Sequence, residues 1–100
     1  NEDLFLEKLY DIVGAGVNIS ESVPSAISIA YYAQDPNKCA LLCANLAGDT
    51  DTIGAMATAI CGAFKGIDYI KEEYIESLNK ANDVDFNSYI SILMNGRSCL

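Results

Sequence analysis

Two carboxylates and a hydroxyl lie within four residues, at Asp49, Asp51 and Thr52, in the segment Gly48 to Ala55. Side chains that offer only oxygen suit a hard divalent cation such as Mg²⁺, Mn²⁺ or Ca²⁺, and they do not suit zinc or copper. A strongly apolar helical pattern follows directly, so this group is expected at the start of a helix. These residues are the first candidates for a metal site.

Helix capping is the alternative interpretation of the same side chains. Asp and Thr are favoured N-cap residues, and the helix dipole stabilises an acid in the first turn by ~0.5–1 kcal/mol. One cap needs only one acid, and two neighbouring carboxylates repel each other, so a bound cation explains the second acid better. An EF-hand loop is excluded, because its fifth and twelfth positions would be Ile53 and Ile60. A phosphatase-type aspartate pair would follow a strand, and the residues before Gly48 do not resemble one.

The segment Gly14-Ala15-Gly16-Val17 is a second candidate site. It matches only the first half of a dinucleotide fingerprint and follows a helical pattern instead of a strand, which argues against a Rossmann fold. Its N–H groups could cradle a phosphate or ribose, and a plain connection between helices is the alternative. For Glu21 and Ser22, which follow, helix capping is again the alternative to a role in a site.

The spacing of apolar residues predicts an all-α fold, with no alternating strand and no internal repeat. A first helix ends at Gly14-Ala15-Gly16, and Ser20 or Ser22 is expected to cap the second, with Pro24 in its first turn. The third helix is expected to start at Asp35-Pro36 and to end near Ala47-Gly48, and the fourth starts within Asp49 to Thr52. Two further helices are expected in the tail, around Tyr69 to Lys80 and around Phe86 to Leu93, with a break at Asn82-Asp83.

The fourth predicted helix is apolar on nearly every side from Ile53 to Phe64. Such a helix must be surrounded by other elements, and it is well short of the roughly 20 apolar residues that span a bilayer. We expect it at the centre of a larger core. Its small residues Gly54, Thr58, Gly62 and Gly66 predict close backbone approach, and Ile53, Met56, Ile60 and Phe64 are expected to fill core volume.

Composition excludes some classes of function. The chain has 100 residues and a formal charge of −8, with six basic against fourteen acidic residues, which argues against a nucleic-acid surface. The four cysteines Cys39, Cys43, Cys61 and Cys99 have no CxxC spacing, and there is no histidine, so we expect reduced, packed thiols in a cytoplasmic protein instead of a zinc site. Because the first residue is Asn and no signal pattern follows, the chain is expected to be a piece of a longer protein.

Three motifs together resemble the C-terminal third of the ADP-ribosylglycohydrolases. They are Gly14-x-Gly16, then Glu21-Ser22-Val23-Pro24-x-Ala26, then Asn45-Leu46-x-Gly48-Asp49-Thr50-Asp51-Thr52-Ile53, with a Gly- and Ala-rich helix behind. The similarity covers about Gly14 to Gly66, and three motifs in order are more specific than the aspartates alone. The resemblance implies an orthogonal multi-helix fold in which residues 1–100 are the C-terminal portion of one domain, with motif region 14–66 and helical tail 67–100.

Enzymes of this family remove ADP-ribose from protein side chains or other acceptors. The resemblance implies a binuclear Mg²⁺ site, with Mn²⁺ in some members, and assigns half of its ligands to Asp49, Asp51 and Thr52. In the family the residue that matches Asp51 typically touches both ions, and the resemblance implies that Asp49 and Asp51 act in catalysis through metal and water. The other half comes from a Thr-Asp-Asp segment, which this chain lacks, so its partner would be the remaining N-terminal part of the protein.

The segment that matches Gly14 to Ser22 lies beside ADP-ribose in the family. Gly14, Gly16, Val17, Glu21 and Ser22 are therefore the predicted ligand contacts. Two positions depart from the pattern: Ala15 stands where many members have Asn or Thr, and Ala47 replaces a common glycine. Both changes are small, and neither removes a predicted metal ligand.

The sequence thus predicts a metal-dependent hydrolase that cleaves the glycosidic bond between ADP-ribose and an acceptor, with no nucleic acid and no membrane as partners. One alternative is a non-catalytic ADP-ribose-binding or interaction module with an incomplete metal site. Another is a helical scaffold in which the aspartates only cap a helix. The isolated hundred residues are expected to be inactive and poorly folded.

Overall fold

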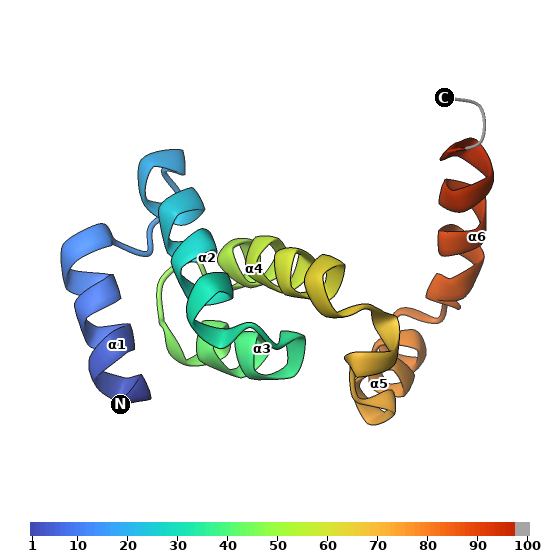
Figure 1. Cartoon of the computed structure of the whole chain (residues 1–100), viewed down its shortest axis with the longest axis horizontal. Coiled ribbons are helices and arrows are strands. Elements are labelled where there is room, and N and C mark those ends of the chain that lie inside the picture. The colour runs from blue at the N-terminus through green and yellow to red at the C-terminus, as the bar shows by residue number, and fades with distance from the viewer. Residues whose placement is uncertain (98–100) are drawn as a thin grey trace. The chain divides into compact units, whose positions relative to one another are not determined.

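The computed structural model describes residues 1–97, and every regular element among them is a helix, which confirms the predicted all-α class (Figure 1). The elements are α1 (Glu2–Lys8), a π-helical turn η1 (Leu9–Val13), α2 (Ile19–Ala33), α3 (Pro36–Asn45), α4 (Thr50–Lys65), a 3₁₀ turn η2 (Ile67–Tyr69), α5 (Glu72–Asn82) and α6 (Phe86–Arg97). They form two compact units, the first of which covers residues 1–70, and the second begins at Lys71.

The core of the first unit lies where α2, α3 and α4 pack against one another. Each helix contributes a side chain with no exposed surface, namely Ile29, Cys39 and Ile53. Burying one isoleucine stabilises a fold by roughly 1.5–3 kcal/mol, so this contact holds the three helices together. At the spacing of one helical face, Cys39, Leu42 and Cys43 of α3 and Leu46 at its end are all buried.

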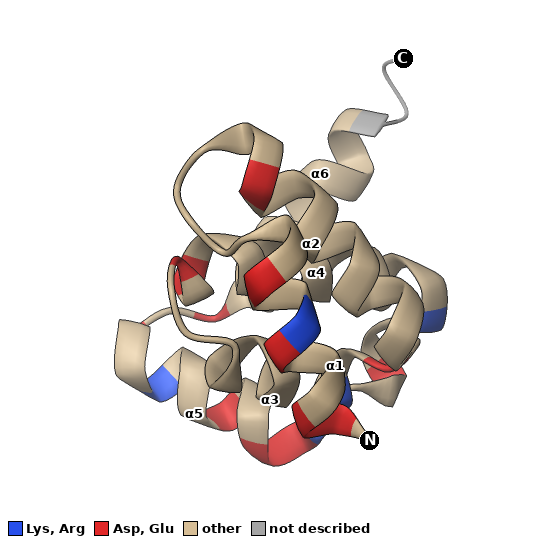
Figure 2. Cartoon of the chain, turned by 90° about the vertical axis from the view of Figure 1, so that its left-hand side faces the viewer, with Lys and Arg blue, Asp and Glu red and all other residues tan. Residues whose placement is uncertain are grey.

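The first helix, α1, is attached to α2 and α3 through the ring of Tyr32. The Phe5 ring stacks on it with 4.1 Å between centroids, and the Lys38 ammonium lies 5.1 Å above it. Lys38 also pairs with the Glu2 carboxylate at 3.2 Å, although both side chains are exposed enough for solvent to weaken this pair. In the view onto α1, acidic residues are spread over the helices (Figure 2).

The starts of α2 and α3 illustrate one wrong prediction and one confirmed prediction. Asp35 caps α3 as expected, accepting hydrogen bonds from the N–H groups of Asn37 (2.7 Å) and Lys38 (3.3 Å). The N-cap of α2 is instead Asn18, because its carbonyl already accepts the N–H groups of Glu21 and Ser22, both at 2.9 Å. Ser20 and Ser22 therefore lie inside the helix, and Pro24 lies past its first turn.

The helix α4 buries a narrower face than its composition predicts. Ile53, Ala57 and Cys61, one turn apart, face the core. Ile60 and Phe64 are 46% and 67% exposed, so the prediction that they fill core volume is wrong for this chain. These two side chains lie on another side of the helix and line the rim of a groove between α2 and α4.

The small residues along α4 allow close approach only near its start. A Cβ added at Gly54 would lie 3.4 Å from the Cβ of Cys43 on α3. At Gly62 and Gly66 an added Cβ would meet no atom within 4 Å. The predicted strip of close backbone contact is therefore wrong beyond the first turns of the helix.

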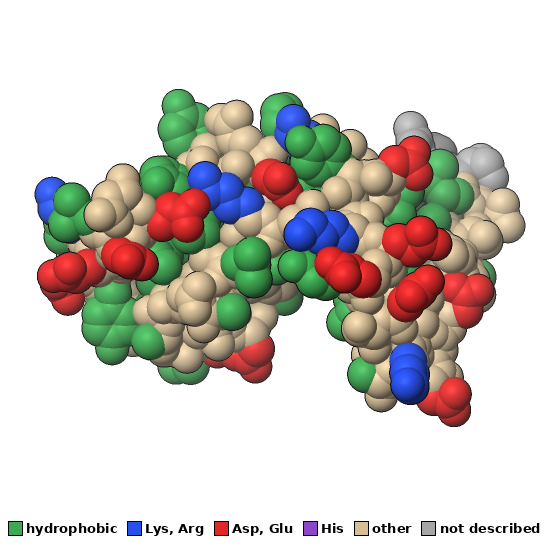
Figure 3. All heavy atoms as spheres, turned by 90° about the horizontal axis from the view of Figure 1, so that it is seen from below, with side chains coloured by type: hydrophobic (Ala, Val, Ile, Leu, Met, Phe, Trp, Pro, Cys, Tyr) green, Lys and Arg blue, Asp and Glu red, His purple; other side chains and the backbone are tan. Residues whose placement is uncertain are grey.

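The second unit contains α5 and α6, and α5 has no buried residue. The predicted break is confirmed, because α5 ends at Asn82 and Asp83 follows in a left-handed conformation with φ of 52°. Hydrophobic side chains lie among charged ones on the face drawn in Figure 3. Within residues 1–97, no helix combines the length and the apolar character needed to cross a bilayer.

Candidate functional site

The first turn of α4 brings the three predicted metal ligands together. The helix begins at Thr50, directly after Asp49, and the Thr52 hydroxyl donates a hydrogen bond to Asp49 Oδ1 at 3.1 Å. The Asp49 carboxylate accepts no hydrogen bond from an N–H group of the helix, so its side chain is not an ordinary N-cap. Asp51 and Thr52 are exposed, and Asp49 is half-buried.

The environment of Asp51 favours its ionised form. A hydrogen bond with the Asp49 carboxyl holds the pKa of Asp51 below its ordinary value, and the N–H groups of Thr52 and of Asp51 itself add to this effect. Backbone N–H groups at a helix start stabilise negative charge for the same reason. At neutral pH Asp51 is therefore a carboxylate, which is the form that binds a cation.

The donor set fits a hard divalent cation but does not complete its shell. Two carboxylates and a hydroxyl are oxygen ligands of the kind that Mg²⁺ takes, and Mg²⁺ requires about six of them. In the part of the chain that the structure describes, no three His, Cys, Asp or Glu side chains are grouped so that they could hold a metal ion. These three side chains alone would therefore leave the ligand shell of a Mg²⁺ ion incomplete.

The glycine loop, residues 14–16, lies directly against this turn. The Asp49 N–H donates a hydrogen bond to the Ala15 carbonyl at 2.7 Å, and Ala15 is buried. Gly48 has φ of 76°, and a Cβ added there would collide with the Ala15 carbonyl oxygen. Two of the sequence motifs, far apart along the chain, are therefore in backbone contact.

Glu21 and Ser25 hold the glycine loop from α2. The Glu21 carboxylate occupies the space that a side chain at Gly14 would need, and it lies 3.0 Å from the Cβ position of Gly16. The Ser25 hydroxyl donates a hydrogen bond to the Gly14 carbonyl. Gly14 has φ of 100°, a conformation that L residues rarely adopt.

The five predicted ligand contacts thus have different surroundings. Gly14, Gly16 and Glu21 lie together at the loop, and Val17 beside them is 79% exposed. Ser22 is 3% exposed, within the packed side of α2. The assignment of all five as ligand contacts remains a prediction.

The sequence pattern does not indicate the roles of Ser25 and Ala15. Ser25 is fully buried on the side of α2 that also carries Ser22 and Ile29, so a serine inside an apolar stripe was the available signal. Ala15 acts through its backbone carbonyl, and no side-chain pattern indicates which carbonyl accepts a distant N–H. Only the folded arrangement of the two loops reveals it.

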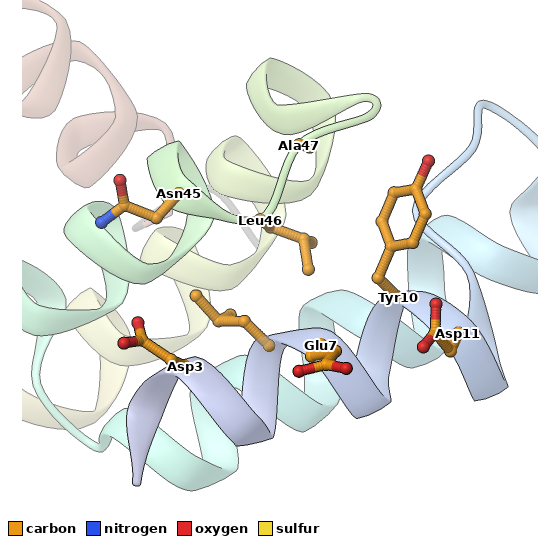
Figure 4. Close-up of a pocket in the computed structure, with 8 residues that line it drawn as sticks. Asp3, Glu7, Tyr10, Asp11, Asn45, Leu46 and Ala47 are labelled. Carbon is orange, nitrogen blue, oxygen red and sulfur yellow. The ribbon is translucent and has the colours of Figure 1, made fainter.

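Two hollows border these segments. One, of about 370 Å³, includes Asp51 and is otherwise lined mainly by small residues of α3 and α4 such as Ala44 and Gly54. The other, of about 290 Å³, lies between the N-terminal helix and the end of α3, where Leu46 points toward α1 (Figure 4). Its rim carries the acidic residues Asp3, Glu7 and Asp11 together with Tyr10, Asn45 and Ala47.

The three described cysteines are buried free thiols, and Cys99 lies outside the described residues. A hydrogen bond with Cys43 raises the pKa of Cys39, and burial raises it further, whereas the same bond lowers the pKa of Cys43. The Cys61 thiol donates to the Ala30 carbonyl at 3.6 Å. These contacts account for the thiols as packed core residues, as the sequence predicts.

Comparison with known proteins agrees with the three motifs. The ADP-ribosylglycohydrolase family model matches residues 2–98. The chain belongs to this family. It is 57% identical over 88 residues to the uncharacterized protein YegU of Escherichia coli (strain K12), covering 87% of this chain and 26% of that protein.

The chain is also similar to ADP-ribosylhydrolase ARH3 from two vertebrates. The human protein is 31% identical over 90 residues (79% of this chain, 25% of the relative), and the Danio rerio protein is 32% identical over 91 residues (80% and 25%). No solved structure gives a significant match. The chain thus spans about a quarter of the length of the relatives it matches.

Proposed function

We propose that this chain is part of a metal-dependent ADP-ribosylglycohydrolase, in which it supplies one half of a binuclear Mg²⁺ site and one wall of the ADP-ribose site. Family membership supports the reaction class. The observation that carries the proposal is the hydrogen bond between the Asp49 N–H and the Ala15 carbonyl, because it puts the candidate cation ligands beside the candidate ligand loop. The remaining part of the longer protein supplies the other cation ligands.

Asp49, Asp51 and Thr52 would hold the cations. When bound, Mg²⁺ or Mn²⁺ supplies positive charge that orients ribose hydroxyls and makes water a better nucleophile. Asp51, exposed at the helix start, presents a carboxylate toward solvent, whereas Thr52 fixes the orientation of Asp49 through its hydroxyl.

The reaction is cleavage of the glycosidic bond at C1″ of the ribose, through a transition state that resembles an oxocarbenium ion. The chain contains no histidine, so any proton transfer by its own side chains falls to carboxylates. A carboxylate is proposed to take the proton of the attacking water. Gly14, Gly16, Val17, Glu21 and Ser22 are proposed to position the ADP-ribose group.

Release of ADP-ribose by the full-length protein tests this function. Asp51→Asn removes a negative charge without changing the size of the side chain, and we expect activity with Mg²⁺ to fall by about 100-fold or more, the effect of losing one active-site charge stabiliser. Asp68→Asn is the matched control, because Asp68 is exposed in η2. We expect this variant to retain full activity. Equal activity of Asp51→Asn and the unmodified protein would contradict the proposal.

The incomplete cation shell favours a second candidate, a non-catalytic ADP-ribose-binding module. The two candidates differ in turnover and in dependence on metal. Calorimetric titration of ADP-ribose into the full-length protein, with Mg²⁺ and with EDTA, separates them. Tight binding that EDTA leaves unchanged, together with no release of ADP-ribose from a modified substrate, would favour the binding module.

We also propose a cytoplasmic location. The supporting observation is that Cys39, Cys43 and Cys61 are buried as free thiols, which is typical of proteins in reducing compartments. ADP-ribose or an ADP-ribosylated substrate is the proposed partner, and the charge of −8 disfavours nucleic acid.

A further inference from the structure

We infer that Ala15 and Gly48 form a positioning contact through which a ligand on the glycine loop strengthens cation binding at the first turn of α4. This inference rests on the proposed function, because it concerns the same two binding segments. It adds a specific physical connection between them. Neither residue is a catalytic residue, since the contact acts through the backbone of Asp49.

The hydrogen bond at the centre of this contact fixes the residue that carries a candidate cation ligand. Ala15 is 3% exposed, so the bond between its carbonyl and the Asp49 N–H, 2.7 Å long, is shielded from water. The N–H group in this bond belongs to Asp49 itself, so the bond holds the backbone from which the Asp49 carboxylate extends. A shift of the Ala15 carbonyl therefore moves the Asp49 carboxylate relative to Asp51.

Gly48 permits the approach that this hydrogen bond requires. A Cβ at position 48 would lie 2.9 Å from the Ala15 Cβ and 3.0 Å from its carbonyl carbon, and closer still to the carbonyl oxygen. These are backbone or backbone-linked atoms, which cannot rotate away as the end of a long side chain does. Any side chain at position 48 must push the two loops apart.

The glycine loop is also held from its other side, which allows it to transmit a displacement. The Ser25 hydroxyl bonds to the Gly14 carbonyl, and the Glu21 carboxylate packs on Gly14 and Gly16. A ligand that contacts this loop thus acts on a segment fixed to both α2 and α4. Coupling of binding free energies is reciprocal, so cation and ligand strengthen each other by the same factor.

Calorimetric titration of Mg²⁺ into the full-length protein, with and without ADP-ribose, tests the contact. The variant Gly48→Ala is compared with Gly66→Ala, because Gly66 has a similar positive φ of 87° but no atom within 4 Å of an added Cβ. We expect ADP-ribose to tighten Mg²⁺ binding at least fivefold in the unmodified protein and in Gly66→Ala. Gly48→Ala should bind Mg²⁺ about 10–100-fold more weakly and lose this tightening.

The results of this titration distinguish a failure of the positioning contact from a failure of the proposed function. If the unmodified protein binds no Mg²⁺, the proposed function and this inference both fall. If it binds Mg²⁺ and Gly48→Ala behaves like Gly66→Ala with and without ADP-ribose, only the positioning contact is overturned.

Hydrogen exchange of the unmodified protein gives a measurement that does not depend on whether Gly48→Ala folds. ADP-ribose is expected to slow amide exchange in residues 48–52, because it stabilises the loop that accepts the Asp49 N–H. Unchanged exchange in this segment at saturating ADP-ribose would overturn the inference.

Discussion

At the level of single residues, the Asp49 carboxylate accepts a hydrogen bond from the Thr52 hydroxyl and makes no ordinary cap bond to α4. The sequence predicts that the three side chains share one helical turn, because their spacing and the apolar run behind them are local features. It does not predict that the Asp49 carboxylate accepts from a hydroxyl at 3.1 Å instead of from a helix N–H. That choice depends on the backbone at Asp49, which the Ala15 carbonyl holds from a distant segment.

Ser25 offers a test of how the glycine loop is held. Ser25→Ala removes a buried hydroxyl and leaves the half-buried Gly14 carbonyl without this donor, so we expect it to lower the free energy of unfolding by about 1–3 kcal/mol. Urea denaturation of the full-length protein measures this change. Ser28→Ala is the control, because Ser28 is less buried and bonds only to Pro24 of its own helix, so its effect should stay within ~0.5 kcal/mol. Equal effects of the two variants would contradict a special role of Ser25.

At the level of elements, prediction succeeded where the signal was local. The Asp35-Pro36 pair places the start of α3 correctly, because an acid that caps and a proline suited to the first helical turn lie next to each other. The start of α2 was misplaced, since Ser20 and Ser22 have the right chemistry for a cap while the Asn18 carbonyl already closes the first turn. The choice among neighbouring polar residues is set by backbone geometry, which composition does not specify.

The cap of α3 can be tested by removing the Asp35 carboxylate. Asp35→Ala deletes the acceptor for the N–H groups of Asn37 and Lys38, and loss of such a cap costs about 0.5–2 kcal/mol. Thermal unfolding of the full-length protein should show a melting temperature lower by roughly 1–8 °C. Asp68→Ala, an exposed acid in η2, should leave the melting temperature unchanged. A melting temperature of Asp35→Ala equal to that of this control would show that the cap is dispensable.

At the level of the whole molecule, the apolar character of α4 exceeds what this chain buries. Ile60 and Phe64 line a groove of about 310 Å³ with Ile27 and Tyr31, and all four side chains are at least 46% exposed. Since the chain spans about a quarter of the length of its relatives, the expectation of a larger surrounding core is consistent with this exposure. The sequence predicts that α4 needs neighbours, but which of its faces this chain covers depends on how α2 and α3 pack.

The binding of Mg²⁺ by the full-length protein and by the isolated hundred residues tests the central claim most directly. We propose that the first turn of α4 is half of a site, so calorimetry should detect two Mg²⁺ ions in the full-length protein and none in the isolated chain at the same concentrations. Asp49→Asn with Asp51→Asn should abolish binding in the full-length protein. Mg²⁺ binding that survives the loss of both carboxylates, or that the isolated chain shows with equal affinity, would contradict the account.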